Sequence, residues 1–233
     1  MEKVIVALRA QGADDEWSAR LCGPVAAELL DLGMAGLTVN VRDAPVRDSL
    51  MTLTTLDPPI QGMVSLWVAQ SYGEQVSGAL EILAAQVDSL AAYLVTESTP
   101  MPPPPSASGE RAPGLANIAF RRRPPDLDEA IWLRRWQHDH TPVAIATQST
   151  FGYVQNYVVR ALTAGAPAVS AIVEELFPIE AAGNLHAFFG AADDAELADR
   201  MGKMIASTSA FGANTNIDTV ATGRYVFRDP FRA

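Results

Sequence analysis

The feature that most constrains the fold is an order of elements that occurs twice along the chain. Residues 4–96 show the hydrophobic patterns of a strand, a helix, two strands, a second helix and a last strand. Residues 117–227 show the same order. Local sequence echoes support the repeat, since residues 23–26 resemble residues 141–144. A period of about 100 residues that keeps its internal order indicates a duplicated structural unit.

The predicted elements of the two halves match one for one. In the first half, strands are expected at residues 4–9, 36–42, 63–70 and 91–96, and helices at 14–32 and 74–86. In the second half, strands are expected at residues 117–122, 153–162, 170–177 and 218–227, and helices at 127–147 and 194–207. We interpret this as an α+β fold of tandem ferredoxin-like βαββαβ repeats. Each unit leaves one apolar sheet face uncovered, so we expect the two antiparallel sheets to pack face to face as an α/β-barrel.

A proline-rich stretch separates the two halves. Six of the 16 prolines lie within residues 100–113, which suits an extended, solvated connector. The sequence therefore predicts an N-terminal ferredoxin-like half at residues 1–99, a linker at residues 100–113 and a C-terminal half at residues 114–233. Both halves are long enough to form a core of their own.

Charge and composition exclude several classes of partner. The chain has 27 acidic and 17 basic residues, for a net charge of −10, which repels nucleic-acid backbones and anionic membrane surfaces. The longest uncharged stretch, residues 141–159, contains glutamine and asparagine and does not suit a membrane span. The single cysteine, Cys22, fits a reducing compartment. We expect a cytoplasmic protein that binds neither nucleic acid nor membrane.

Three motifs in the second half resemble a known family. The pattern Trp136-x-x-x-His140-x-Pro142 ends the predicted helix, and the Tyr/Gln/Asn-rich residues 151–157 and the acidic-aromatic residues 171–177 follow it. Together they resemble the EthD family of the dimeric α/β-barrel superfamily. The resemblance implies a ligand-sized barrel cavity, but the fold does not imply one chemistry. In most relatives two chains form the barrel, whereas here one chain carries both sheets, and a homodimer remains open.

Residues suited to proton transfer concentrate in the second half. It holds all three histidines and 13 of the 17 aromatic residues, so we expect it to supply the working site. The first half is then a degenerate partner with a poorer site. His140 is the leading general acid or base, because an imidazole of near-neutral pKa can transfer a proton at cytoplasmic pH. The alternative is a surface cation at the end of a helix.

The strand that follows offers groups that could orient a substrate. Alternation puts Tyr153, Gln155 and Tyr157 on one face and Asn156 on the other, and the sequence does not decide which face meets a cavity. We assign catalytic roles to His140, Tyr153 and Asn156. Substrate contacts are assigned to Trp136, Gln155, Tyr157 and Glu175. Facing an apolar cavity, Glu175 would have a raised pKa and could act as a base, and its alternative is an ion pair with an arginine at a strand end.

No motif in the sequence indicates a cofactor. Nucleotide loops and a nucleophile elbow are absent. His138 and His140 are two residues apart on a predicted helix and point to nearly opposite sides, so they cannot easily reach one metal ion. His186 is the candidate if the chain binds haem, but a partly buried histidine that caps an apolar turn is the favoured interpretation. We therefore predict a cofactor-free isomerase, cyclase or dehydratase that takes a small apolar carbonyl or aromatic compound in a cavity of roughly 300–1,000 Å³. The alternatives are a cofactor-independent monooxygenase and a non-catalytic carrier.

Overall fold

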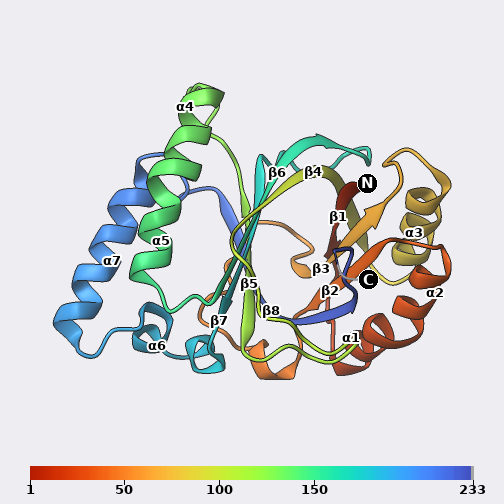
Figure 1. The fold of residues 1–233 in the computed structure, drawn as a ribbon, viewed down its shortest axis with the longest axis horizontal. Coiled ribbons are helices and arrows are strands. Elements are labelled where there is room, and N and C mark those ends of the chain that lie inside the picture. The colour runs from red at the N-terminus through yellow and green to blue at the C-terminus, as the bar shows by residue number, and fades with distance from the viewer. Residues whose placement is uncertain (232–233) are drawn as a thin grey trace.

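Eight antiparallel strands close into one barrel in this computed structural model, which describes residues 1–231 (Figure 1). The strands are β1 (Glu2–Arg9), β2 (Gly36–Val41), β3 (Ile60–Val68), β4 (Ser89–Met101), β5 (Leu115–Arg121), β6 (Gly152–Ala161), β7 (Ala171–Phe177) and β8 (Ile217–Arg228). Their order around the barrel is β1-β3-β2-β8-β5-β7-β6-β4. The predicted α+β barrel of two ferredoxin-like sheets is confirmed.

Each half contributes four neighbouring strands, and the two sheets join at both edges. Around the barrel the first half has the order β4-β1-β3-β2, and the second half continues in the same direction with the equivalent order β8-β5-β7-β6. At one seam β2 pairs with β8, and at the other β4 pairs with β6, so the second strand of each half pairs with the fourth strand of the other. Hydrogen bonding at both seams leaves no open sheet edge. One chain therefore closes the barrel without a partner subunit.

Helices cover the barrel on two opposite sides. They are α1 (Asp15–Arg20), α2 (Ala26–Asp31), α3 (Glu74–Ala84), α4 (Glu129–Arg134), α5 (Thr141–Thr147), α6 (Leu185–Phe189) and α7 (Asp194–Ser209). Figure 1 shows α1–α3 on one side and α4–α7 on the other. Within residues 1–231, no helix combines the length and apolar composition that a bilayer span requires.

The first predicted helix of each half is interrupted by a wider turn. Residues 14–32 divide into α1 and α2 around a π turn at Leu21–Val25, where Gly23 leaves the helical region and Pro24 has no backbone N–H to donate. Residues 127–147 divide into α4 and α5 around a π turn at Arg135–His140, directly before Pro142. The short helix α6 was not predicted, because five residues are too few for a periodic signal.

The proline-rich segment does more than connect the halves. Strand β4 continues to Met101, so the first residues of the predicted linker belong to the barrel wall. The following residues, Pro102–Pro105, line a pocket at one end of the barrel together with residues of both halves. The segment therefore contributes to the surface of a cavity as well as to chain connectivity.

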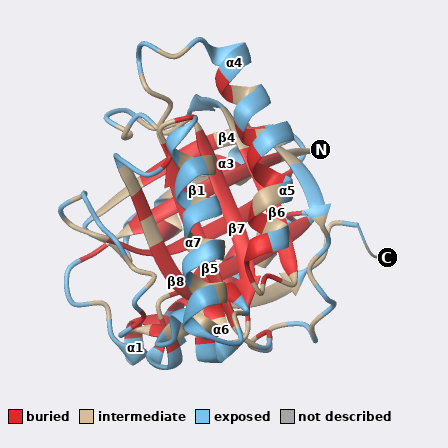
Figure 2. Ribbon diagram, turned by 90° about the vertical axis from the view of Figure 1, so that its left-hand side faces the viewer, coloured by how far each residue is buried: buried red, intermediate tan, exposed pale blue. Residues whose placement is uncertain are grey.

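Apolar side chains form three layers. The barrel interior holds residues of both halves, including Ile5, Met63, Ile118, Phe120 and Ile172. A second core lies between the first sheet and α1–α3, and further cores lie between the second sheet and α4–α7. Figure 2 shows the strands buried over most of their length, whereas α7 is exposed or intermediate, with no buried residue. The apolar face left open by each sheet is thus buried inside the barrel.

Candidate functional site

The barrel wall sorts the polar side chains of β6 and β7 into two separate regions. Val154 and Glu174 face the barrel-end pocket, whereas Tyr153 packs in the core beneath α4 and α5. Side chains alternate along a strand, so Asn156 shares the inner face and Glu175 shares the face toward the helices. The structure therefore presents two polar regions, one between the second sheet and its helices and one at an end of the barrel.

The first region, which we call the helix-side cluster, consists of Arg121, Trp136, His140, Tyr153 and Glu175. Strand register builds its floor, because Tyr153 on β6 and Asn117 on β5 both lie directly opposite Glu175 on β7. Trp136 and His140 come from the π turn between α4 and α5 and are fully buried. The structure therefore brings together four of the seven residues predicted for the site, and adds Arg121.

His140 is a buried neutral imidazole. Its Nδ1 lies 2.9 Å from the Ser207 hydroxyl of α7, and its ring centroid is 4.9 Å from that of Phe211. Burial lowers the pKa of His140 to about 2, and the neighbouring Arg121 guanidinium acts in the same direction. The alternative of a surface cation is therefore wrong, and so is the near-neutral pKa on which the acid–base role of His140 was argued. The imidazole can exchange hydrogen bonds, but it does not carry positive charge near pH 7.

Glu175 is buried, and its pKa is higher than that of an ordinary surface glutamate. Burial raises its pKa, while the Arg121 guanidinium and the Asn117 amide lower it to a smaller extent. Among the ion pairs of residues 1–231, none includes Glu175. A buried carboxyl group with a raised pKa is a candidate general acid or base.

Unpartnered polar atoms converge in the helix-side cluster. Atoms that lack a hydrogen-bond partner within the described part of the chain are Nε and Nη1 of Arg121, Nε1 of Trp136, Nε2 of His140, the hydroxyl of Tyr153 and Oε1 of Glu175. A buried polar atom without a partner costs about 1–3 kcal/mol, and folded proteins keep few of them. Burial also raises the pKa of Tyr153, so its hydroxyl stays protonated. The cluster therefore holds several buried donors and acceptors in one part of the core.

The remaining predicted residues lie outside this cluster, and their side chains already form hydrogen bonds with other residues. Gln155 donates to the Thr141 hydroxyl at 2.6 Å and accepts from Ser98 at 3.2 Å, which ties β6 to α5 and β4. Tyr157 lies at the rim and donates to Glu129. Asn156 faces the barrel interior and donates to the carbonyl of Ile172 at 3.0 Å. The sheet therefore separates Asn156 from His140 and Tyr153, with which it was grouped.

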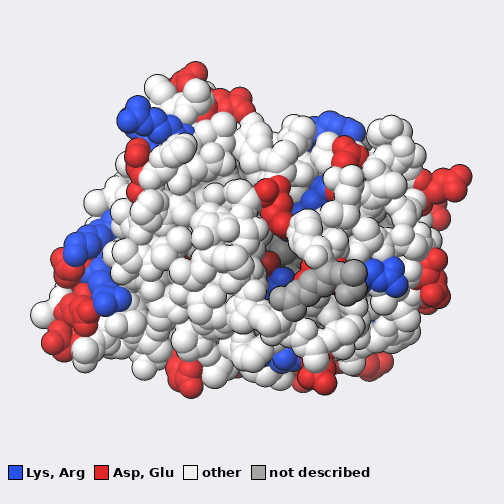
Figure 3. Space-filling view, viewed as in Figure 1, with Lys and Arg blue, Asp and Glu red and all other residues white. Residues whose placement is uncertain are grey.

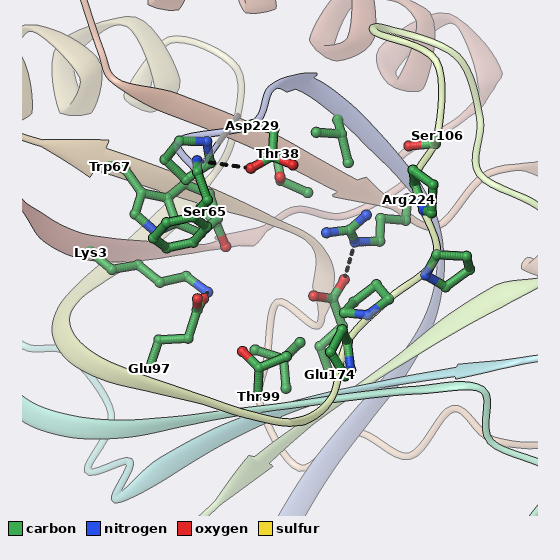
Figure 4. Close-up of a pocket in the computed structure, with 18 residues that line it drawn as sticks. Lys3, Thr38, Ser65, Trp67, Glu97, Thr99, Ser106, Glu174, Arg224 and Asp229 are labelled. Carbon is green, nitrogen blue, oxygen red and sulfur yellow. Dashed lines mark hydrogen bonds and ion pairs between the residues drawn. The ribbon is translucent and has the colours of Figure 1, made fainter. Parts of the chain in front are cut away.

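The second polar region is a cavity of about 320 Å³ at one end of the barrel, which we call the barrel-end pocket. Figure 4 shows two ion pairs on its walls, Lys3 with Glu97 and Arg224 with Glu174, the latter at 3.1 Å. Trp67 adds an aromatic wall. Most of these groups belong to the first half, so the expectation that this half is the poorer one does not hold for the pocket. One signal was present in the sequence, since Lys3 is one of only two lysines and precedes an apolar run.

The other two histidines lie apart from both polar regions. His186 on α6 lies 3.0 Å from Asp194 and is partly exposed, and His138 is exposed on the far side of its turn from His140. In the part of the chain that the structure describes, no three His, Cys, Asp or Glu residues are grouped to hold a metal ion. Figure 3 shows acidic and basic side chains interspersed on the face it displays, with charged side chains inside a central hollow.

Comparisons with known proteins show the fold and not the activity. No family model matches the sequence, and no curated protein matches it. An anthrone oxidase-like protein of known structure is 10% identical, with a TM-score of 0.56 over 100% of this chain and 96% of the other. A candidate monooxygenase from Lactobacillus acidophilus NCFM is 7% identical, with a TM-score of 0.49 over 97% of this chain and 96% of the other. A candidate chlorite dismutase is 12% identical, with a TM-score of 0.47 over 96% and 94%. The similarity to the anthrone oxidase-like protein extends over the whole length of this chain and agrees with the ferredoxin-like α/β-barrel fold.

Proposed function

We propose that this chain is an EthD-like protein that binds a small apolar carbonyl or aromatic compound at the helix-side cluster. There it moves a proton on that compound without a cofactor, as an isomerase, cyclase or dehydratase does. The observation that carries the proposal is a group of five neighbouring buried side chains, each of which keeps at least one polar atom without a partner within residues 1–231. Such groups match a ligand that offers a carbonyl or phenol oxygen and an acidic C–H bond.

The chemistry of the cluster suggests a division of roles. The Glu175 carboxyl group, with its raised pKa, transfers the proton. The Arg121 guanidinium stabilises the negative charge that develops on the substrate oxygen, and the Tyr153 hydroxyl donates to the same oxygen. His140 is neutral and oriented by Ser207, so it positions the substrate through Nε2. Glu175 replaces His140 as the proton carrier in this scheme.

A groove between α5 and α7 provides an approach to the cluster. It has a volume of about 740 Å³ and is lined by Pro142, Val143, Ala146 and Ser207, among others. Ser207 belongs to this groove and also bonds His140, so the groove borders the cluster directly. Helix α7 has no fully buried residue and packs on the core beneath it through the partly buried Leu197, Met201 and Met204. We infer that a substrate enters beneath α7.

A cofactor-independent monooxygenase is the second candidate. Its supporting observation is the fold similarity to an anthrone oxidase-like protein. In that reaction the cluster would remove a proton from an electron-rich phenol or anthrone, and the resulting anion would react with molecular oxygen. The third candidate is a carrier that binds the same compounds and leaves them unchanged. All three use one binding region and differ in what happens after binding.

Proton transfer is tested with model carbonyl compounds. The protein is incubated in deuterated buffer with small aryl ketones and with anthrone. NMR follows exchange at the carbon beside the carbonyl of the ketones and at the methylene group of anthrone, and an electrode follows oxygen. We expect exchange without oxygen uptake. Glu175→Gln should lower the exchange rate at least about 100-fold, the scale of a general acid or base. The matched control is Glu180→Gln, at an exposed position outside the cluster.

The other outcomes separate the alternatives. Oxygen uptake that depends on Glu175 would replace the isomerase proposal with the monooxygenase. Binding of the compounds without proton exchange or oxygen uptake would support the non-catalytic carrier instead. Mass spectrometry of the denatured protein, which identifies compounds that copurify with it, would supply the substrate class independently of the probes.

A further inference from the structure

Lys3 is a buried amine on the wall of a cavity. Its side chain is 6% exposed and lines the barrel-end pocket, with Nζ 4.6 Å from the centroid of the Trp67 ring. The chain has only one other lysine, Lys203, which lies exposed on α7. Lys3 shares one face of β1 with Ile5 and Ala7 of the barrel core, so strand geometry directs its side chain toward the interior. A lysine in such a position is uncommon, because this side chain is rarely fully buried.

Charged groups from three other strands surround the amine. Glu97 of β4 forms an ion pair with it, and Glu174 of β7 and Arg224 of β8 lie further along the pocket wall. Burial lowers the pKa of Lys3, while the two glutamates act in the opposite direction and Arg224 adds to the lowering. A desolvated lysine of this kind is a nucleophile toward carbonyl carbon. The Glu97 carboxylate is in place to accept the proton that the ammonium loses.

We propose that the barrel-end pocket is a second ligand site, in which a small aldehyde or ketone condenses with Lys3 to form an imine. The neutral amine adds to the carbonyl carbon, a C–N bond forms, and the carbonyl oxygen becomes a hydroxyl group. Loss of that hydroxyl as water then gives the C=N bond. Glu97 takes the proton released by the ammonium and returns one to the departing oxygen, so no oxidant or reductant is consumed.

The pocket has the size and surfaces that such a ligand requires. Its volume of about 320 Å³ lies at the lower end of the range of small-ligand sites. Trp67, Pro102–Pro105 and Phe231 provide an apolar wall, and the hydroxyl-bearing residues Thr38, Ser65 and Thr99 line the same space. Figure 4 shows Lys3 and Glu97 together on one wall, across from the Glu174–Arg224 pair. A planar aryl aldehyde fits this combination of aromatic wall and hydroxyl groups.

Reductive trapping tests the proposal on the intact protein. The protein is incubated at pH 7 with benzaldehyde and sodium cyanoborohydride, which reduces an imine to a stable benzylamine. Cleavage after Glu2 separates the α-amine of Met1 from Lys3, so peptide mass spectrometry reads the three amines of the chain independently. We expect Lys3 to be labelled faster than Lys203, since a lowered pKa raises the fraction of neutral amine at pH 7. Burial alone predicts the reverse order.

Two outcomes would overturn the inference. Labelling confined to Lys203 and the α-amine would show that Lys3 is a closed ion pair. Fast labelling of Lys3 that persists unchanged in urea would show ordinary amine reactivity without a folded site. The comparison is made within one sample and needs no variant, and Lys3→Arg serves only to confirm the peptide assignment. The readout involves neither Glu175 nor ketone exchange, so it stands or fails separately from the proposed function.

Discussion

Glu174 and Glu175 are consecutive residues of β7, but their carboxyl groups lie on opposite sides of the barrel wall. Glu174 accepts from Asn40 Nδ2 at 2.9 Å and from Arg224 Nε at 3.1 Å inside the barrel. Glu175 faces the helices, where burial raises its pKa and no ion pair within the described chain compensates. One strand therefore places two identical side chains in two different surroundings, one in each polar region.

Replacing Glu175 by glutamine should stabilise the protein at alkaline pH. A carboxyl group with a raised pKa in the folded state binds more protons there than in the unfolded chain, so the free energy of unfolding falls as pH rises. The loss begins at the unfolded pKa of about 4.3 and ends at the raised folded value. Glu175→Gln removes that loss.

Thermal unfolding at pH 4 and pH 8 measures this effect. We expect the wild type and the variant to differ little at pH 4, with the variant melting higher at pH 8. In a chain of this size, 1 kcal/mol corresponds to about 2–4 °C. The opposite result would be a variant that melts below the wild type at pH 8 but not at pH 4. It would show that Glu175 is charged and favourably paired.

Removing Arg224 should be strongly destabilising. The Arg224→Met variant leaves the buried Glu174 carboxylate with only an amide partner, which costs about 3–5 kcal/mol. Lys203→Met, which breaks the exposed pair with Asp199, should change stability by less than about 1 kcal/mol. Urea unfolding measures both. Adding Glu174→Gln to Arg224→Met should recover most of the loss, and a double variant as unstable as the single one would contradict the argument from buried charge.

The strands and their duplication could be predicted, because each strand carries an apolar pattern that local sequence displays. Which face of β6 is directed toward the helices could not be predicted, because alternation separates Tyr153 from Asn156 without identifying the side that each one faces. The interrupted helices had a visible cause in Pro24 and Pro142. The hydrophobic periodicity did not predict that a π turn divides each of these helices in two, because it does not show the local backbone geometry.

The two polar regions differ in how far the sequence could reveal them. His140, Tyr153 and Glu175 lie within one half, and their types alone suggested proton chemistry. The barrel-end pocket depends on contacts across the chain, such as Lys3 with Glu97 and Glu174 with Arg224. Those pairs form only when the barrel closes and the proline-rich segment covers its end, so no local pattern predicts them.

Acid should destabilise the protein through His140. The unfolded chain takes up a proton near pH 6.5, whereas the folded His140 has a pKa of about 2, so stability falls as pH drops below 6.5. This histidine alone accounts for a loss of about 1.4 kcal/mol by pH 5.5. In His140→Gln the loss between pH 7.5 and 5.5 should be smaller by that amount, as urea unfolding would show. His138→Gln, at an exposed position of the same turn, is the matched control.

Two glycines with the same backbone conformation should respond differently to a methyl group. Gly114 and Gly165 have φ of +79° and +71°, so alanine at either position carries the strain of the left-handed region, about 1–2 kcal/mol. At Gly114 the added Cβ would also lie 2.1 Å from the carbonyl oxygen of Phe177, whereas at Gly165 it meets nothing within 4 Å. Strand β5 must therefore shift against β7 in Gly114→Ala, and the variant should lose more stability than Gly165→Ala by at least about 1–3 kcal/mol, the usual cost of overpacking. Equal midpoints of urea unfolding for the two variants would mean that residues 112–115 adopt another path at no cost.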